Sequence, residues 1–181
     1  LLEEDDNGAF SSPTTRYTGS DTTWDAVGTA PGTYYYRVKA SNTWGDSAWS
    51  TSQSVTVLPP CVPDPAGESD NVYDALTVCS GQTVSGRVSE GSDSDDVYGI
   101  LAVAGQQLTI SMNGSGGDAD LYLYPPGTTN VETDDWADWS NEPDNDEFIQ
   151  TTLAEDGYWY IDVFAYEETT DYNVTITVSV P

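Results

Sequence analysis

The sequence of 181 residues has no histidine, and it contains only one lysine, one methionine and two cysteines. The lack of histidine excludes Ser–His–Asp and Cys–His catalytic sets, and it excludes the usual histidine-containing zinc sites. Two paired carboxylates can hydrolyse a glycoside, but acids are so numerous here that any pair spacing arises by chance. We therefore expect a protein that is not an enzyme.

Long apolar runs are also missing. Runs such as Ile100–Ala104 are far shorter than the roughly 18 residues of a membrane-spanning helix, so no membrane insertion is expected. No stretch repeats apolar residues with the period of 3.6 that marks an amphipathic helix. The sequence does not begin with methionine and shows no signal peptide, so if the protein is secreted we expect the signal to have been removed.

Basic residues are scarce, with 4 against 31 acids and a net charge of −27. Residues 1–60 hold 7 acids and 3 bases, whereas residues 61–181 hold 24 acids and 1 base. Such a surface repels nucleic-acid phosphates and anionic membranes and attracts hard cations. Solubility or adaptation to high salt is the alternative explanation. The six tryptophans and 12 tyrosines favour a folded chain over a disordered one.

The two cysteines, Cys61 and Cys79, lie close together at the start of the acidic half. An even count and a short loop fit one disulfide, which indicates an extracellular or cell-surface location. The alternative is a pair of free thiols in a cytosolic protein.

The acidic half has the pattern of short strands separated by turns. Tyr172, Val174 and Ile176 alternate with Asn173 and Thr175, as in a strand with one buried face. Turn signals include Asn113–Gly117 and Pro125–Gly127. This spacing predicts a β-sandwich or jelly-roll-like domain. The predicted strands are Thr83–Val88, Asp96–Val103, Gln107–Met112, Ala119–Tyr124, Glu147–Leu153, Tyr158–Ala165 and Tyr172–Val180.

Residues 31–57 have a different pattern, PGTYYYRVKASNTWGDSAWSTSQSVTV. Tyr34, Tyr36 and Val38 alternate with Tyr35 and Arg37, which predicts a strand with one buried face. The order P-G-T-x-Y-x-V-x-A followed by G-x-S-x-W-S resembles the fibronectin type III family over residues 1–57. That resemblance implies a binding or spacer module. Such sandwiches need about 100 residues and seven strands, so we expect the first two strands to be missing.

An incomplete sandwich exposes apolar side chains and unpaired strand edges, which are a template for another chain. We therefore expect residues 1–57 to be covered by a neighbour through strand addition, giving a homo-oligomer or fibre. Most of the larger apolar side chains of this part should face that core: Phe10, Trp24, Tyr34, Tyr36, Val38, Trp49 and Val55.

The second half carries another resemblance. The segments GDADLYLY and GYWYIDV, within residues 64–180, are similar to the bacterial pre-peptidase C-terminal domain. The resemblance implies a small jelly-roll-like sandwich that is attached to secreted proteases and other extracellular proteins, is usually non-catalytic and in several members binds calcium. We thus expect an all-β protein: an incomplete fibronectin type III-like sandwich (1–57), a linker (58–63) and a jelly-roll-like β-sandwich (64–181).

In that family, an acidic lead-in and an Asp-rich turn before a strand hold calcium. Ser69 and the order Asp70-Asn71 depart from the family's lead-in. The run at Asp93 is not an EF-hand loop, because Tyr98 and Ala104 stand where Gly and Glu are required. Solvated turn acids are the alternative. The resemblance implies these ligands: Glu68, Asp70, Asn71, Asp93, Asp95 and Asp96.

Residues 132–147 are a second acidic cluster, containing eight acids that repel one another unless a cation lies among them. With two acids of the preceding strand, a second metal cluster would comprise Asp118, Asp120, Asp144 and Asp146. Trp136 and Trp139 lie in the same segment, where they either pack on the sandwich or stack on a sugar.

Asn113 and Asn173 begin glycosylation sequons. The sequence as a whole predicts a calcium-stabilised, non-catalytic extracellular protein of a fibre or adhesive array. The alternative is a region of a secreted hydrolase that targets a substrate such as a polysaccharide or an extracellular protein.

Overall fold

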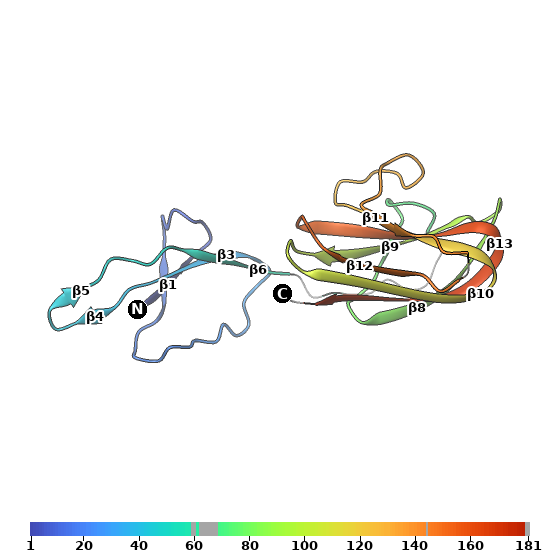
Figure 1. Cartoon of the computed structure of the whole chain (residues 1–181). Helices are drawn as coiled ribbons and strands as arrows, with labels where there is room; N and C mark the ends of the chain where they lie inside the picture. The colour runs from blue at the N-terminus through green and yellow to red at the C-terminus, as the bar shows by residue number, and fades with distance from the viewer. Residues whose placement is uncertain (59–60, 62–68, 144, 180–181) are drawn as a thin grey trace. The chain divides into compact units, whose positions relative to one another are not determined.

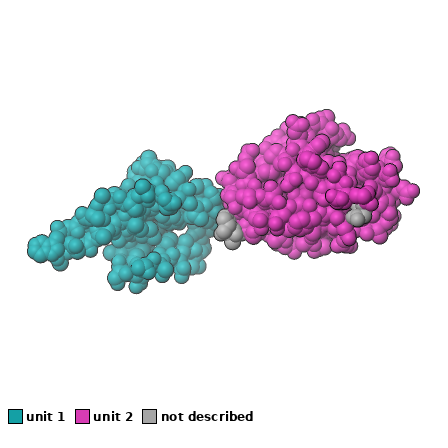
Figure 2. Space-filling view, viewed as in Figure 1, with its two compact units in different colours: residues 1–60 teal, residues 61–181 magenta. Residues whose placement is uncertain are grey.

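The computed structural model describes residues 1–58, 61, 69–143 and 145–179 and divides the chain into two compact units, Leu1–Pro60 and Cys61–Pro181 (Figure 2). The described residues form thirteen strands and no helix, which confirms the predicted all-β class. Over these residues, no helix is long and apolar enough to cross a membrane.

Unit 1 is built on one antiparallel sheet in the order β2-β1-β3-β6. A two-stranded hairpin, β4-β5, adjoins it. The strand predicted from the alternation at Tyr34–Val38 is confirmed as β3, in the centre of this sheet. The strands are β1 Leu2–Asp5, β2 Thr14–Tyr17, β3 Gly32–Val38, β4 Ser41–Asn42, β5 Gly45–Asp46 and β6 Gln53–Val57.

One face of the unit 1 sheet is covered around Arg37 by side chains of the same unit. The guanidinium of Arg37 lies 4.1 Å from the ring centroid of Phe10 and 4.3 Å from that of Trp49, in two cation–π contacts. It also donates two hydrogen bonds to Glu3, of 2.8 and 3.0 Å. Phe10 and Trp49 therefore pack on the face of Arg37 and not on that of Tyr36, because neighbouring residues of β3 point to opposite faces.

Unit 2 contains β7 Leu76–Thr77, β8 Gln82–Ser89, β9 Asp95–Ala102, β10 Gln107–Tyr124, β11 Asp138–Ser140, β12 Phe148–Thr152 and β13 Gly157–Ser179. Two of these strands, β10 and β13, are long and bent (Figure 1), and the whole of β10 pairs with residues 160–179 of β13. Residues 107–116 of β10 and 169–179 of β13 pair with β12 and β8 to make layer 1. Residues 118–124 and 157–167 pair with β11 and β9, which with β7 make layer 2.

The predicted turn at Asn113–Gly117 is wrong, because β10 runs through it. β10 and β13 stay paired through this segment. The register of their pairing shifts on each side of Asp118, because β13 has an extra residue at each of these two points. Glu168 in β13 has a positive φ of 57°. Gly117 lets the backbones meet, since a Cβ there would lie 2.0 Å from the carbonyl oxygen of Glu167. The glycines of residues 113–117 therefore mark a bulged bend of the strand rather than a chain reversal.

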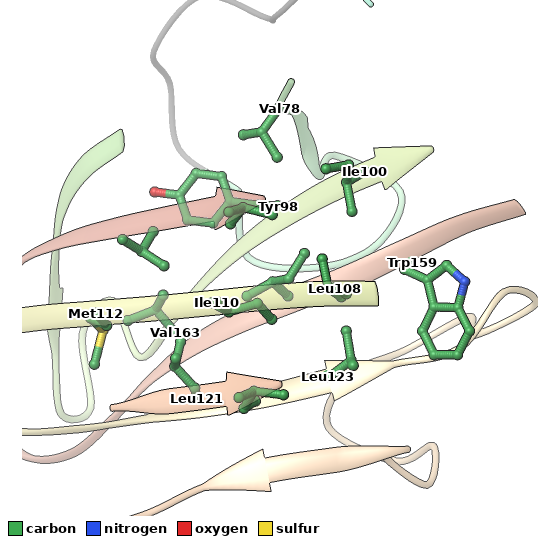
Figure 3. Packing of buried hydrophobic residues seen from close by; sticks show 14 of the residues in the cluster. Val78, Tyr98, Ile100, Leu108, Ile110, Met112, Leu121, Leu123, Trp159 and Val163 are labelled. Atoms are coloured by element: carbon green, nitrogen blue, oxygen red, sulfur yellow. The ribbon is translucent and has the colours of Figure 1, made fainter. Parts of the chain in front are cut away.

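The core of unit 2 lies between the two layers. Leu108 and Ile110 of layer 1 cluster with Leu121 and Leu123 of layer 2 (Figure 3), and all four are fully buried. The alternation predicted for the last strand is confirmed, because Tyr172, Val174 and Ile176 are buried. In contrast, no apolar side chain described in unit 1 is fully buried.

The predicted disulfide is confirmed. Cys61 and Cys79 are bonded, with their Cα atoms 5.7 Å apart. The bond ties the start of unit 2 to the segment that follows β7.

Candidate functional site

The second face of the unit 1 sheet is open and largely apolar. It forms a concavity of about 690 Å³ whose walls include Leu2, Trp24, Tyr36, Val38 and Val55. Val38 is 51% exposed and Val55 48% exposed, although both belong to the paired strands β3 and β6. Trp24 covers part of the face, with its ring centroid 6.2 Å from that of Tyr36. Apolar side chains on a central strand normally pack against a second layer, so the exposure indicates a contact surface.

Glu4 is a buried acidic group beside Tyr36 on this open face. It is 5% exposed, and it accepts hydrogen bonds from Arg16 at 2.5 Å and from the hydroxyl of Tyr36 at 2.7 Å. Burial raises the pKa of Glu4, but the hydrogen bonds from Arg16 and Tyr36 outweigh it and lower the pKa below its usual value. Burial raises the pKa of Tyr36 to about 12, so the hydroxyl stays a donor at neutral pH.

In unit 2 the carboxylates that were expected to hold calcium lie in different environments. Asp95 and Asp96 are neighbours on β9 and point to opposite faces of layer 2. Asp93 accepts a backbone hydrogen bond from Ser89 at 2.7 Å in the turn before β9. Asp70 is exposed, and Glu68 lies outside the described residues.

Asp96 points into the sandwich. The buried hydroxyl of Tyr172 donates a hydrogen bond of 2.6 Å to its Oδ2, and the hydroxyl of Tyr98 lies 2.6 Å from that of Tyr172. Burial raises the pKa of Tyr172 far above its usual value, which keeps this hydroxyl protonated as a donor. Asp96 is therefore part of a polar network inside the core.

Asp95 points to the outer face of layer 2, where a buried acid that the sequence analysis missed is also found. Asp162 of β13 is 2% exposed and pairs directly with Val97 and with Tyr122 of β10. Burial raises the pKa of Asp162 well above its usual value, and the charges of Asp95 and Asp96 raise it further. The alternation of residues along this strand could have revealed Asp162, because it puts Asp162 on the same face as the aromatic Tyr160 and Phe164.

Two segments cover this outer face, residues 69–75 and 125–137, here called the covering loops. Val97 and Ser69 exchange two hydrogen bonds, of 2.6 and 2.7 Å. The hydroxyl of Tyr124 donates to the carbonyl of Val131 at 2.7 Å. The amide oxygen of Asn71 accepts from the backbone N–H of Val131, which joins one covering loop to the other. Asn71 thus has a structural use besides the expected ligand role.

Burial also raises the pKa of Asp95, which is only partly offset by a hydrogen bond from Ser94. The negative charges of Glu132, Asp70 and Asp93 then raise it further, so acids surround Asp95. Among the residues that the structure describes, however, no three acidic side chains come together as a ready metal-binding group.

The second expected cluster is partly assembled. Asp120 is 4% exposed and accepts from the hydroxyl of Tyr122 at 3.3 Å; burial and then the charge of Asp118 raise its pKa. Asp118 Oδ1 is buried and has no hydrogen-bond partner within the described part of the chain. Asp146 is exposed on the next segment, and Asp144 lies outside the described residues.

The two tryptophans of that segment are half exposed, 49% for Trp136 and 52% for Trp139. Trp136 packs on Tyr122 with ring centroids 5.4 Å apart, and its ring is inclined by 70° to that of Trp139. Sugar stacking by these two residues stays a prediction.

Asn113 and Asn173 are both exposed and lie directly opposite each other on β10 and β13. Directly opposed residues have Cβ atoms about 5 Å apart. Because two glycans would collide there, we expect a glycosylated preparation to carry at most one of them per chain. Intact mass and site mapping test this, and chains occupied at both sites would contradict it.

Some solved structures are similar to the chain at low identity. The pre-peptidase C-terminal domain of collagenase from Bacillus anthracis is 18% identical, with 63% of this chain and 100% of that chain covered and a TM-score of 0.48. PliG of Aeromonas hydrophila, a periplasmic lysozyme inhibitor of g-type lysozyme, is 17% identical, with 54% and 85% covered and a TM-score of 0.47. Salmonella Typhimurium PliG is 20% identical, with 57% and 96% covered and a TM-score of 0.39.

No curated protein sequence gives a significant match. No family match includes residues 1–57, so the fibronectin type III resemblance of that part stays a prediction. For the second half the expected family is confirmed over part of its length, because residues 94–165 match the bacterial pre-peptidase C-terminal domain.

Proposed function

We propose that this chain is a non-catalytic, extracellular accessory region that works by binding, and that the open face of unit 1 is its contact surface. The observation that carries the proposal is the concavity of about 690 Å³ on that face, with Val38 and Val55 half exposed on paired strands. The Cys61–Cys79 bond and the match of residues 94–165 to the bacterial pre-peptidase C-terminal domain support the extracellular location.

The partner that we propose is a neighbouring subunit in a fibre or array. Strand addition at β2 or β6 would extend the sheet but leave its face open, so the neighbour must supply a second layer. Unit 1 holds 7 acids and 3 bases, which is a much weaker charge than that of unit 2. Repulsion between copies is therefore smallest where the open face lies.

Sedimentation velocity tests the assembly. We expect the wild-type chain to form species larger than a single chain, and Val55→Glu to remain a single chain because it places a charge on the open face. Thr56→Glu is the matched control, since Thr56 is exposed on the opposite face of β6. Its hydroxyl oxygen lies 3.1 Å from that of Thr33. Circular dichroism must show that both variants keep their strands. A wild-type chain that stays single at every concentration would contradict the assembly.

A second candidate is the accessory region of a secreted hydrolase, which the match of residues 94–165 to the pre-peptidase C-terminal domain favours. In that case the open face or the exposed Trp136 and Trp139 would contact a polysaccharide or an extracellular protein. A single-chain species that binds an insoluble polymer would favour this candidate over the fibre.

We also propose that calcium stabilises unit 2. The support is its charge of 24 acids against 1 base, together with the acids around Asp95. Free calcium at 100 times its Kd would add about 2.7 kcal/mol to the free energy of unfolding. Thermal unfolding with calcium and with EDTA measures this. An equal gain from high NaCl would mean that charge screening is the cause.

A further inference from the structure

Among the residues that the structure describes, no basic side chain pairs with Asp162. A buried carboxylate is normally paired with a cation, bound to a metal or protonated. Asp162 is 2% exposed, and its Oδ1 has no hydrogen-bond partner among the described residues. The sequence gives residues 61–181 a single basic residue, Arg87, which pairs with the exposed Asp171 at 2.6 Å. The charge of Asp162 must therefore be met by a proton or by a cation from solution.

Negative charge from several segments gathers beside Asp162. Asp95 of β9 lies on the same outer face, two pairs along the ladder, because Asp162 pairs with Val97 and Phe164 with Asp95. Asp70 and Glu132 belong to the two covering loops, and the charges of both act on Asp95. A proton would neutralise one carboxylate and leave the others, whereas a divalent cation interacts with all of them.

We propose that Asp162 and Asp95 form the buried end of a binding site for one hard divalent cation of the calcium class. This inference rests on the proposed stabilisation by calcium and assigns it to β9, β13 and the covering loops rather than to Asp93 and Asp96. Calcium takes 6–8 oxygen ligands, so the exposed carboxylates of Asp70 and Glu132 turn inward to complete the site. The bound cation thereby fixes the covering loops on layer 2.

Terbium luminescence tests the assignment. Terbium takes the ligands of calcium and emits when a nearby tyrosine is excited, and Tyr122 and Tyr124 flank Asp162, whose charge acts on both. We expect the wild-type chain to give emission that calcium removes. Asp162→Asn should bind terbium at least about tenfold more weakly. Glu155→Gln is the control, because it removes the same charge from an exposed turn and should bind as the wild type does.

The outcomes separate this inference from the proposal on which it rests. Asp162→Asn with wild-type terbium affinity and an unchanged calcium shift in Tm would overturn the assignment alone, and a raised Tm in EDTA would then show that Asp162 carries a proton. No terbium or calcium binding by the wild-type chain would overturn both proposals. If Asp162→Asn fails to fold, Asp95→Asn replaces it, with the same expected loss and the same overturning result.

Discussion

Gly117→Ala is expected to destabilise unit 2 by about 3 kcal/mol or more, or to prevent its folding. The added Cβ would lie 2.0 Å from the carbonyl oxygen of Glu167 and 2.9 Å from the backbone nitrogen of Thr169. Both are backbone atoms of the facing strand, so no side chain can turn away to make room. The clash falls at the bend where β10 and β13 pass from one layer to the other, which affects both layers.

Chemical denaturation of unit 2 measures this effect. Gly99→Ala is the matched control, because a Cβ there makes an ordinary contact of 3.5 Å with the ring of Tyr158. We expect that control to unfold within about 1 kcal/mol of the wild-type chain. Equal stability of Gly117→Ala and Gly99→Ala would mean that β10 and β13 do not approach at the bend as described.

Asp96→Ala is expected to lower the free energy of unfolding of unit 2 by about 3 kcal/mol. We expect the loss to be the same in calcium and in EDTA. The substitution removes the acceptor of the buried Tyr172 hydroxyl and leaves a small cavity beside Tyr98. Asp93→Ala is the control, since Asp93 lies in a partly exposed turn, and a change within about 0.5 kcal/mol is expected.

The calcium dependence of that result distinguishes two roles for Asp96. If Asp96 were a metal ligand, as the family resemblance implied, its loss would cost more in calcium than in EDTA. An equal loss in both conditions agrees with a carboxylate that holds the core network together. A loss confined to the calcium-bound protein would contradict the structural role.

The strand pattern was predictable wherever one face of a strand is buried. The alternation at Tyr172–Ile176 predicted the end of β13 because every second side chain enters the core. The turn predicted at Asn113–Gly117 was wrong because glycine is used both in turns and where two strands approach closely, and sequence alone does not distinguish the two. The strand β11 was missed because three residues carry too little alternation to be recognised.

The candidate sites were predictable only in part, because they depend on which strands become neighbours. Asp95 and Asp96 were grouped because the family resemblance implied an Asp-rich turn that contains both, yet adjacent strand residues point to opposite faces. Asp162 lies 66 or more positions from both, and only the register of β9 on β13 places it near them. The open face of unit 1 was expected because the fibronectin type III resemblance implied two missing strands, although Phe10 and Trp49 belong to the other face.

Hydroxyl-radical footprinting of the wild-type chain, dilute and concentrated, tests most directly whether the open face of unit 1 is its contact surface. We expect oxidation of Trp24, Tyr36 and Val55 to fall in the concentrated sample, because a second layer covers them. Trp44, which is 95% exposed and outside the concavity, is the internal reference and should be oxidised equally in both samples. Unchanged oxidation of Trp24, Tyr36 and Val55 in assembled material would show that the contact lies elsewhere and would contradict the proposed function.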